Sequence, residues 1–174
     1  ACRQNMDWQK KGLPPIKVSV NLSALQFEQE NLTEEITSAL EKSALDPKYL
    51  EIEITESTIM KNAEKTINII NELKKKGISV SIDDFGTGYS SLSYLKKFNV
   101  DSLKIDRSFV KDITTSADDA AIVMAIINMS NSLNLEVIAE GVETEDQNVF
   151  LKNAKCRIIQ GYFFSKPISA SELE

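Results

Sequence analysis

Short stretches in which apolar and polar residues alternate recur along the chain and are separated by stretches with helical periodicity. The alternation predicts β-strands at residues 17–22, 50–55, 78–85, 102–106, 136–142 and 157–164. Apolar residues spaced three and four apart predict helices at residues 32–43, 63–76, 91–98, 118–133 and 145–153. Residues 1–11 have the composition of a helix, and the last six residues read as the start of another. Strands that alternate with helices predict an α/β fold with a parallel sheet.

The two faces of these strands differ, which separates two parallel architectures. The segments KVSVNLS (17–23), LEIEIT (50–55) and SLKID (102–106) place Val, Leu or Ile on one face and small, polar or charged residues on the other. An open sheet covered by helices on both faces would be apolar on both. A barrel packs one face on helices and carries its chemistry at the carboxyl ends of the strands. An antiparallel sheet with one wet face would alternate in the same way, but the helical crossovers argue against it.

We therefore expect a TIM-type (β/α) barrel with about six βα units and parallel strands. A closed barrel has eight strands and about 250 residues, whereas this chain has 174 residues. The first helix has no cap signal, the last is unfinished, and no linker divides the chain. We expect residues 1–174 to form a single partial domain, a truncated barrel whose N-terminal strands are missing.

Charge and composition narrow the function. The net charge of −6 and the isoelectric point of about 4.9 disfavour DNA or RNA binding and membrane contact by this segment, because both need basic patches. The chain has no histidine, which excludes His-dependent triads and most zinc chemistry. Cys2 and Cys156 are far apart and read as reduced thiols of a cytoplasmic domain.

Polar residues gather where the predicted strands end. They are Asn21, Glu53, Glu56, Asp83, Asp84, Lys104, Asp106, Glu140, Glu143 and Gln160. A lone carboxylate at a strand end is usually a solvated tip, but here six consecutive strands end in polar residues, and four of them end in carboxylates. The adjacent acids Asp83 and Asp84 repel each other and are costly to desolvate unless a cation binds beside them. Oxygen ligands without His or Cys suit Mg²⁺, Mn²⁺ or Ca²⁺, and a cluster of this size can hold two ions.

The same residues fall within six motifs: NLS (21–23), EITE (53–56), DDFGTGYSSL (83–92), KID (104–106), AEGVE (139–143) and QG (160–161). In content and order these motifs resemble the EAL-domain family, bacterial phosphodiesterases for the second messenger cyclic di-GMP. They cover nearly the whole chain. The resemblance implies a barrel enzyme that hydrolyses cyclic di-GMP to linear pGpG by two-metal-ion catalysis.

The resemblance also implies a set of metal ligands. Asn21, Glu53 and Asp83 would bind a first Mg²⁺ or Mn²⁺, and Asp83 would bridge to a second ion held by Asp84 and, directly or through water, by Glu140. The ions would acidify the water that attacks phosphorus. Ca²⁺ would inhibit.

Other residues receive roles in the same way. Lys104, Glu140 and Asp83 would be catalytic: Lys104 orients the water or steadies the developing charge, and Glu140 accepts a proton. Three residues would act in a second layer or near the substrate: Asp106, Glu143 and Gln160. Glu56, on the opposite phase of its strand from Glu53, would anchor the loop at residues 85–91.

The Glu-Ala-Leu tripeptide that names the family is absent from this chain. In the family it lies on the first barrel strand, and its Glu is a metal ligand. Without that ligand, we expect the isolated chain to be a poor phosphodiesterase. The longer protein that would carry the first strand, its parent, is expected to be competent. A degenerate EAL domain that acts as a cyclic di-GMP receptor or a protein-interaction module stays open as the alternative. A metal-dependent lyase would fit the acids but not the DDFGTG and KID motifs.

The sequence also suggests partners. The helix at 118–133 is apolar almost all the way round, whereas an outer barrel helix should show one stripe, so we expect a homodimer contact there, as is common in the family. An upstream sensory or GGDEF-type domain in the parent fits the resemblance. The expected location is the bacterial cytoplasm, including as the cytoplasmic part of a membrane-anchored parent.

Overall fold

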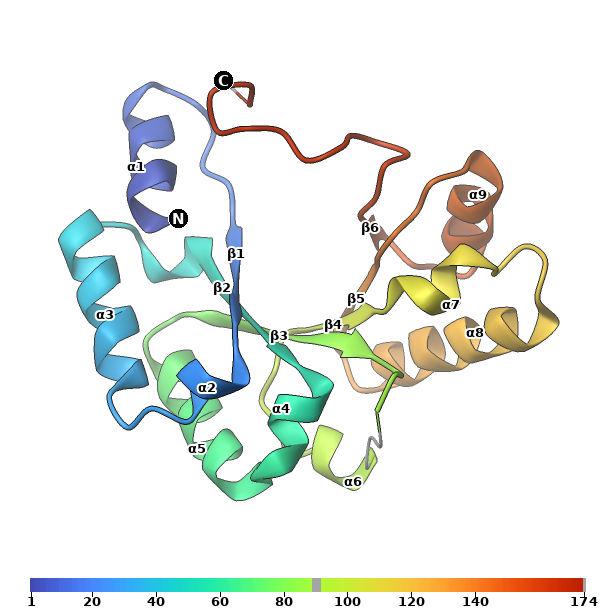
Figure 1. The fold of residues 1–174 in the computed structure, drawn as a ribbon, viewed down its shortest axis with the longest axis horizontal. Coiled ribbons are helices and arrows are strands. Elements are labelled where there is room, and N and C mark those ends of the chain that lie inside the picture. Colours follow the sequence, from blue (N-terminus) through green and yellow to red (C-terminus); the bar gives the residue numbers. More distant parts are fainter. Residues whose placement is uncertain (89–91, 174) are drawn as a thin grey trace.

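The computed structural model describes residues 1–88 and 92–173, which form one six-stranded parallel sheet (Figure 1). The strands lie in sequence order, and each pairs in parallel with the next. They are β1 (Val18–Leu22), β2 (Leu50–Thr55), β3 (Ser79–Phe85), β4 (Ser102–Ile105), β5 (Glu136–Ala139) and β6 (Ile158–Ile159). The helical elements are α1 (Cys2–Lys10), α2 (Ala24–Phe27), α3 (Leu32–Ser43), η1 (Pro47–Tyr49), α4 (Glu56–Lys61), α5 (Ala63–Lys75), α6 (Leu92–Leu95), α7 (Arg107–Lys111), α8 (Ala117–Ser132) and α9 (Glu145–Asn153).

The longer helices lie outside the strands. In Figure 1, α3, α5 and α8 follow the left, lower and right sides of the view, while β1 and β6 diverge toward its upper side. Within the described residues, β1 and β6 each have one neighbour in the sheet. Parallel strands in sequence order, joined by helical crossovers, confirm the predicted α/β fold of barrel type. No helix in the described part of the chain is both long and apolar enough to span a membrane.

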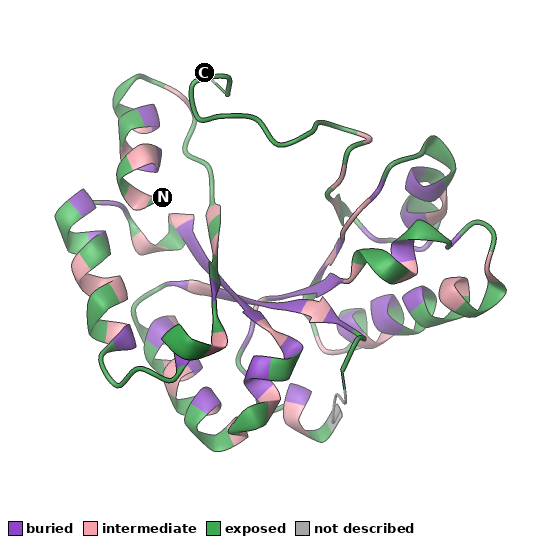
Figure 2. Ribbon diagram, viewed as in Figure 1, coloured by how far each residue is buried: buried purple, intermediate pink, exposed green. Residues whose placement is uncertain are grey.

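The apolar face of the strands packs beneath the helices. Ile54, Val80 and Leu103 are fully buried, as are Leu73 on α5 and Ile127 on α8, and Figure 2 shows the central strands β2, β3 and β4 largely buried. The polar face of the central strands is screened from solvent too, whereas Ser19 and Asn21 on β1 are exposed. Its buried members include Glu51, Glu53, Ser81, Ser102 and Lys104. Buried charges are tolerated when they are paired, so this face has to supply its own counter-charges.

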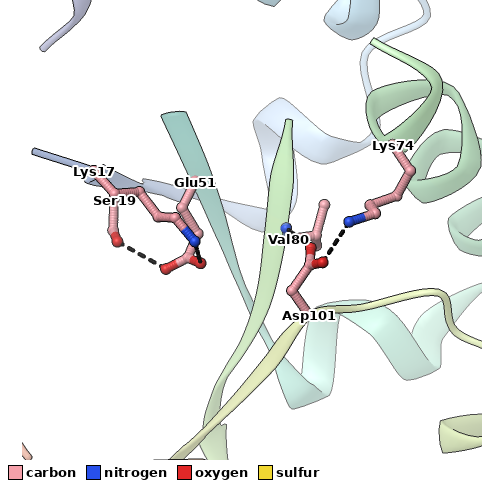
Figure 3. Close-up of polar contacts among 6 residues, drawn as sticks. All are labelled: Lys17, Ser19, Glu51, Lys74, Val80 and Asp101. Atoms are coloured by element: carbon pink, nitrogen blue, oxygen red, sulfur yellow. Dashed lines mark hydrogen bonds and ion pairs between the residues drawn. The ribbon is translucent and has the colours of Figure 1, made fainter. Parts of the chain in front are cut away.

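Two polar contacts join neighbouring elements near the amino ends of the strands (Figure 3). Asp101, just before β4, accepts a hydrogen bond from the backbone N–H of Val80 at 2.9 Å and forms an ion pair with Lys74 of α5. Glu51 of β2 accepts from the Ser19 hydroxyl of β1 at 3.0 Å and lies 3.5 Å from the Lys17 ammonium. Side chains thus fix β3 to β4 and neutralise a buried acid between β1 and β2.

The structure corrects several predicted boundaries. The sequence pattern misses α2, η1, α4 and α7, which are too short to show a helical period. The strand predicted at 136–142 ends at Ala139, because Gly141 has a φ of +72°. The strand predicted at 157–164 is confined to Ile158–Ile159, and turns replace both its remainder and the helix predicted at the C-terminus. Of the helix predicted at 91–98, α6 covers Leu92–Leu95, and its first predicted residue lies outside the described residues.

Candidate active site at the carboxyl ends of the strands

The ammonium group of Lys104 lies among three carboxylates. Its Nζ is 2.6 Å from Glu140 Oε1, 2.9 Å from Glu53 Oε2 and 3.2 Å from Asp83 Oδ1. Lys104 is only 4 % exposed, and an ammonium group has three N–H donors, so each donor has an acceptor. The four residues belong to β2, β3, β4 and the residue after β5. The structure therefore brings together at one edge of the sheet four residues that the sequence spreads over 88 positions.

A bulge in β3 gathers the two adjacent acids. Neighbouring side chains of a regular strand point to opposite faces, which would separate Asp83 from Asp84. Here the register with β4 shifts between Ile82 and Phe85, and Asp84 has a φ of +53°. Such a bulge re-aims a side chain. As a result, one carboxylate oxygen from each of Asp83, Asp84 and Glu140 lies within 4.8 Å of the others.

Asn21 of β1 completes a second group of oxygen ligands. One terminal atom of its amide lies 3.2 Å from Asp83 Oδ2 and 3.3 Å from Glu53 Oε2. A nitrogen at that position donates to both carboxylates, whereas an oxygen there leaves three oxygens converging on one point. Three convergent oxygens from an amide and two carboxylates are a donor set for Mg²⁺ or Mn²⁺. The residues therefore fit a divalent cation.

The electrostatics of the cluster reflect its excess of acids. Burial would lower the pKa of Lys104, but hydrogen bonds and charge interactions with Glu140 and Glu53 outweigh burial and raise it. The pKa of Glu140 is raised by burial, with Asp83 and Glu53 adding to the effect and Lys104 opposing it. The pKa of Asp84 is raised, first by burial and then by Asp83. One ammonium faces several carboxylates, so the site favours additional cations.

Glu56 lies apart from this cluster and contacts the loop after β3. It is the first residue of α4, not a residue on the opposite phase of β2 as the sequence suggested. Its Oε2 accepts a hydrogen bond from the backbone N–H of Gly86 at 2.8 Å. Its Oε1 faces Gly88 so closely that a Cβ there would lie 2.8 Å away. These contacts involve Gly86 and Gly88, and residues 89–91 of the loop that Glu56 was expected to anchor lie outside the described residues.

Of the remaining three predicted residues, Asp106 lies beside Asp84 and helps to raise the pKa of that carboxylate. Among the described residues, no side-chain contact joins Glu143 or Gln160 to the Lys104 cluster. Asp106 caps α7 by accepting from the backbone N–H of Ser108 at 2.9 Å. Burial pushes the pKa of Asp106 upward, but the hydrogen bonds from Ser108 outweigh it and lower that pKa. Glu143 and Gln160 have exposed side chains on the segments that follow β5 and β6.

Sequence reasoning missed a polar layer beneath the site. Ser81 and Ser102 lie two residues before Asp83 and Lys104 on their strands, and both are buried. Their hydroxyls have no hydrogen-bond partner among the residues that the structure describes. The signal was present in the alternating pattern, since residues two apart on a strand share a face.

Parallel strands joined by helices, with acids, an amide and a lysine gathered at the carboxyl ends of the strands, define the class of metal-dependent barrel enzymes. Within that class the chain belongs to the EAL domain family, whose model matches residues 1–167.

Two relatives from Pseudomonas aeruginosa illustrate the similarity. The bifunctional diguanylate cyclase/cyclic di-GMP phosphodiesterase MucR is 45 % identical over 99 % of this chain, and the cyclic di-GMP phosphodiesterase NbdA is 44 % identical over 100 % of it. The chain covers 25 % of the first protein and 22 % of the second. It therefore corresponds to about a quarter of the length of these relatives.

Solved structures agree with the fold. The structure of PaMucR phosphodiesterase in complex with c-di-GMP matches with a TM-score of 0.97 at 45 % identity, over 100 % of this chain and 70 % of that one. The manganese and cyclic di-GMP complex of Klebsiella pneumoniae BlrP1 matches with a TM-score of 0.84 at 29 % identity, over 95 % of this chain and 42 % of that one. BlrP1 has also been solved with calcium.

Proposed function

We propose that this chain is the cyclic di-GMP phosphodiesterase part of its protein and hydrolyses cyclic di-GMP to linear pGpG. The observation that carries the proposal is the set of three carboxylates around Lys104 at the carboxyl ends of the strands, in a member of a family whose relatives MucR and NbdA carry that activity in their names. The c-di-GMP complex of PaMucR supports the choice of substrate.

The proposed cofactors are two Mg²⁺ or Mn²⁺ ions. Asn21, Glu53 and Asp83 would hold one ion, because the Asn21 amide lies 3.2 Å from Asp83 Oδ2 and 3.3 Å from Glu53 Oε2 and can turn its oxygen toward a bound cation. Asp83, Asp84 and Glu140 would hold the other, because their oxygens lie within 4.8 Å of one another. When bound, divalent ions neutralise phosphate charge and lower the pKa of a coordinated water. Ca²⁺ prefers more ligands and a looser geometry than Mg²⁺, and in this proposal it inhibits.

The chain's own groups perform the proton and charge steps in this proposal. Glu140 accepts a proton from the attacking water, and its raised pKa brings it closer to the working pH of a general base. Lys104, which is itself buried, donates hydrogen bonds to oxygens that gain negative charge. Three side chains at the margin of the site would contact the substrate or the residues that bind it: Asp106, Glu143 and Gln160. Glu56 positions the loop at Gly86–Gly88.

The proposed partners follow from the surface and from the relatives. Ile122 is 40 % exposed and Met124 is 36 % exposed on α8, which supports a homodimer contact along that helix. MucR joins a diguanylate cyclase to its phosphodiesterase, which supports a GGDEF-type or sensory domain elsewhere in this protein. We place the domain in the bacterial cytoplasm. We also propose that β1 and β6 meet further strands of a barrel, of which residues 1–174 form a part.

The test is hydrolysis of cyclic di-GMP by the full-length protein with Mn²⁺, followed by chromatography of pGpG. The expected result is turnover that EDTA abolishes and Ca²⁺ suppresses. Residues 1–174 alone should turn over far more slowly than the full-length protein. Binding of cyclic di-GMP without hydrolysis would contradict the proposal and establish the receptor alternative.

A further inference from the structure

Lys104 uses oxygens from both proposed metal subsites. It contacts Glu53 Oε2, the same oxygen that lies 3.3 Å from the Asn21 amide. It also contacts Glu140 Oε1 and Asp83 Oδ1, on two residues of the other oxygen cluster. The ammonium group therefore lies between the two sets of ligands and is hydrogen-bonded to members of each.

These contacts have an electrostatic consequence. Several acids at the end of a buried sheet repel one another, and a single ammonium group relieves part of that repulsion. A divalent ion at Glu53 or Glu140 would draw on the lone pairs that Lys104 now uses. It would also approach a fixed positive charge of the same sign, in surroundings that screen it poorly because the lysine is buried.

We propose that Lys104 is a built-in counter-cation, which holds the carboxylates together without metal and competes with the divalent ions for them. This inference rests on the proposed metal site and adds a function to one of its residues. A lysine that served catalysis alone would leave metal affinity unchanged or would strengthen it by ordering the ligands. A competing lysine weakens metal affinity and confines tight binding to ions with a charge of at least two.

The experiment measures Mn²⁺ binding, not turnover. Lys104→Met in the full-length protein removes the charge and keeps a similar length, and Lys104→Gln serves as a second neutral variant in case the first misfolds. Lys61→Met is the matched control, because Lys61 also pairs with a glutamate, Glu28 at 3.6 Å, but on the exposed surface. Mn²⁺ dissociation constants come from calorimetry, and thermal unfolding is followed with EDTA and with saturating Mn²⁺.

The proposal expects Lys104→Met to bind Mn²⁺ at least about tenfold more tightly than wild type. This is a lower limit for the effect of removing one positive charge close to the ion in poorly screened surroundings. It also expects a lower Tm than wild type in EDTA and a larger gain in Tm on adding Mn²⁺. Lys61→Met should match wild type in all three measurements. Equal or weaker Mn²⁺ binding by both neutral Lys104 variants would overturn the proposal.

The outcome is separable from that of the proposed function. Hydrolysis of cyclic di-GMP by the wild-type protein tests the function, whereas the change in Mn²⁺ affinity on removing Lys104 tests the competition. A protein that hydrolyses the substrate, but whose neutral Lys104 variants bind Mn²⁺ no more tightly, retains its function and loses this inference. A protein in which neither wild type nor the variants bind Mn²⁺ loses both.

Discussion

Glu56 and Gly86 join helix α4 to the loop that follows the central acids. The Gly86 N–H donates to Glu56 Oε2 at 2.8 Å, and Gly86 itself has a φ of +101° with the Phe109 ring 2.8 Å from where a Cβ would lie. A buried carboxylate that accepts from a backbone N–H fixes the backbone there. The position of Asp84, two residues earlier, thus depends on a residue outside the cluster.

Replacing Glu56 with Ala should loosen this loop. We expect faster hydrogen exchange at the Gly86 amide and a kcat lower by about tenfold or more, since misplacing a ligand by an ångström is costly. Gly88→Ala should act in the same direction, because its Cβ would lie 2.8 Å from Glu56 Oε1. Glu64→Ala, an exposed change on α5, is the control. Normal protection of Gly86 in Glu56→Ala would show that the carboxylate does not hold the loop.

The contact between Asp101 and Lys74 should affect the free energy of unfolding and not the catalytic rate. Asp101→Ala leaves the Val80 N–H without its side-chain acceptor and Lys74 without its partner, so we expect a loss of about 2 kcal/mol in the free energy of unfolding. Lys48→Ala, which removes an exposed pair with Asp46, should cost much less, because water and salt screen an exposed ion pair. Urea unfolding measures both. Equal losses would show that the Asp101 contact is an ordinary surface pair.

Much of the fold follows from the sequence because the barrel pattern is local. Alternation in LEIEIT predicts β2 with its observed bounds, Leu50–Thr55, and the spacing of apolar residues predicts α9 at Glu145–Asn153. The resemblance to the family rests on motifs that recur at strand ends, so it also predicts which residues meet. Lys104, Glu53, Asp83 and Glu140 do lie together.

The parts that the sequence does not predict depend on contacts between distant segments. The bulge that turns Asp84 toward Asp83 depends on pairing with β4, and a strand pattern gives no sign of it. Glu56 directly follows the predicted strand, and a continued strand would place it on the opposite phase from Glu53, but the chain turns into α4 at that residue. Strand β6 is shorter than predicted, and beyond it Gly161 lies against the backbone of Val142, where a Cβ would come within 2.1 Å of the carbonyl oxygen.

Replacing Asp83 with Asn tests the ligand assignment directly. Asp83 contributes to both oxygen clusters, so losing its charge should weaken Mn²⁺ binding and lower kcat by about a hundredfold or more. Asp46→Asn changes the charge equally at an exposed site and should leave both unchanged. Retention of more than about a tenth of the activity by Asp83→Asn would show that the two-ion assignment is wrong.

The raised pKa of Asp84 predicts how pH affects the stability of the metal-free protein. Its ordinary value is 3.8, and burial and the charge of Asp83 raise it in the folded state. The folded protein then holds this proton more tightly than the unfolded chain does, so the stabilising contribution is complete below pH 3.8 and is lost as the pH rises through the raised pKa.

The variant Asp84→Asn tests this dependence, because its side chain has no carboxyl proton to lose. In EDTA, urea unfolding should therefore show the variant gaining stability relative to wild type as the pH rises through that range, and then a constant difference. With saturating Mn²⁺ the order should reverse, because the ionised carboxylate binds the ion. A difference between variant and wild type that does not change with pH would contradict the assignment of Asp84 as a carboxylate held beside Asp83 without metal.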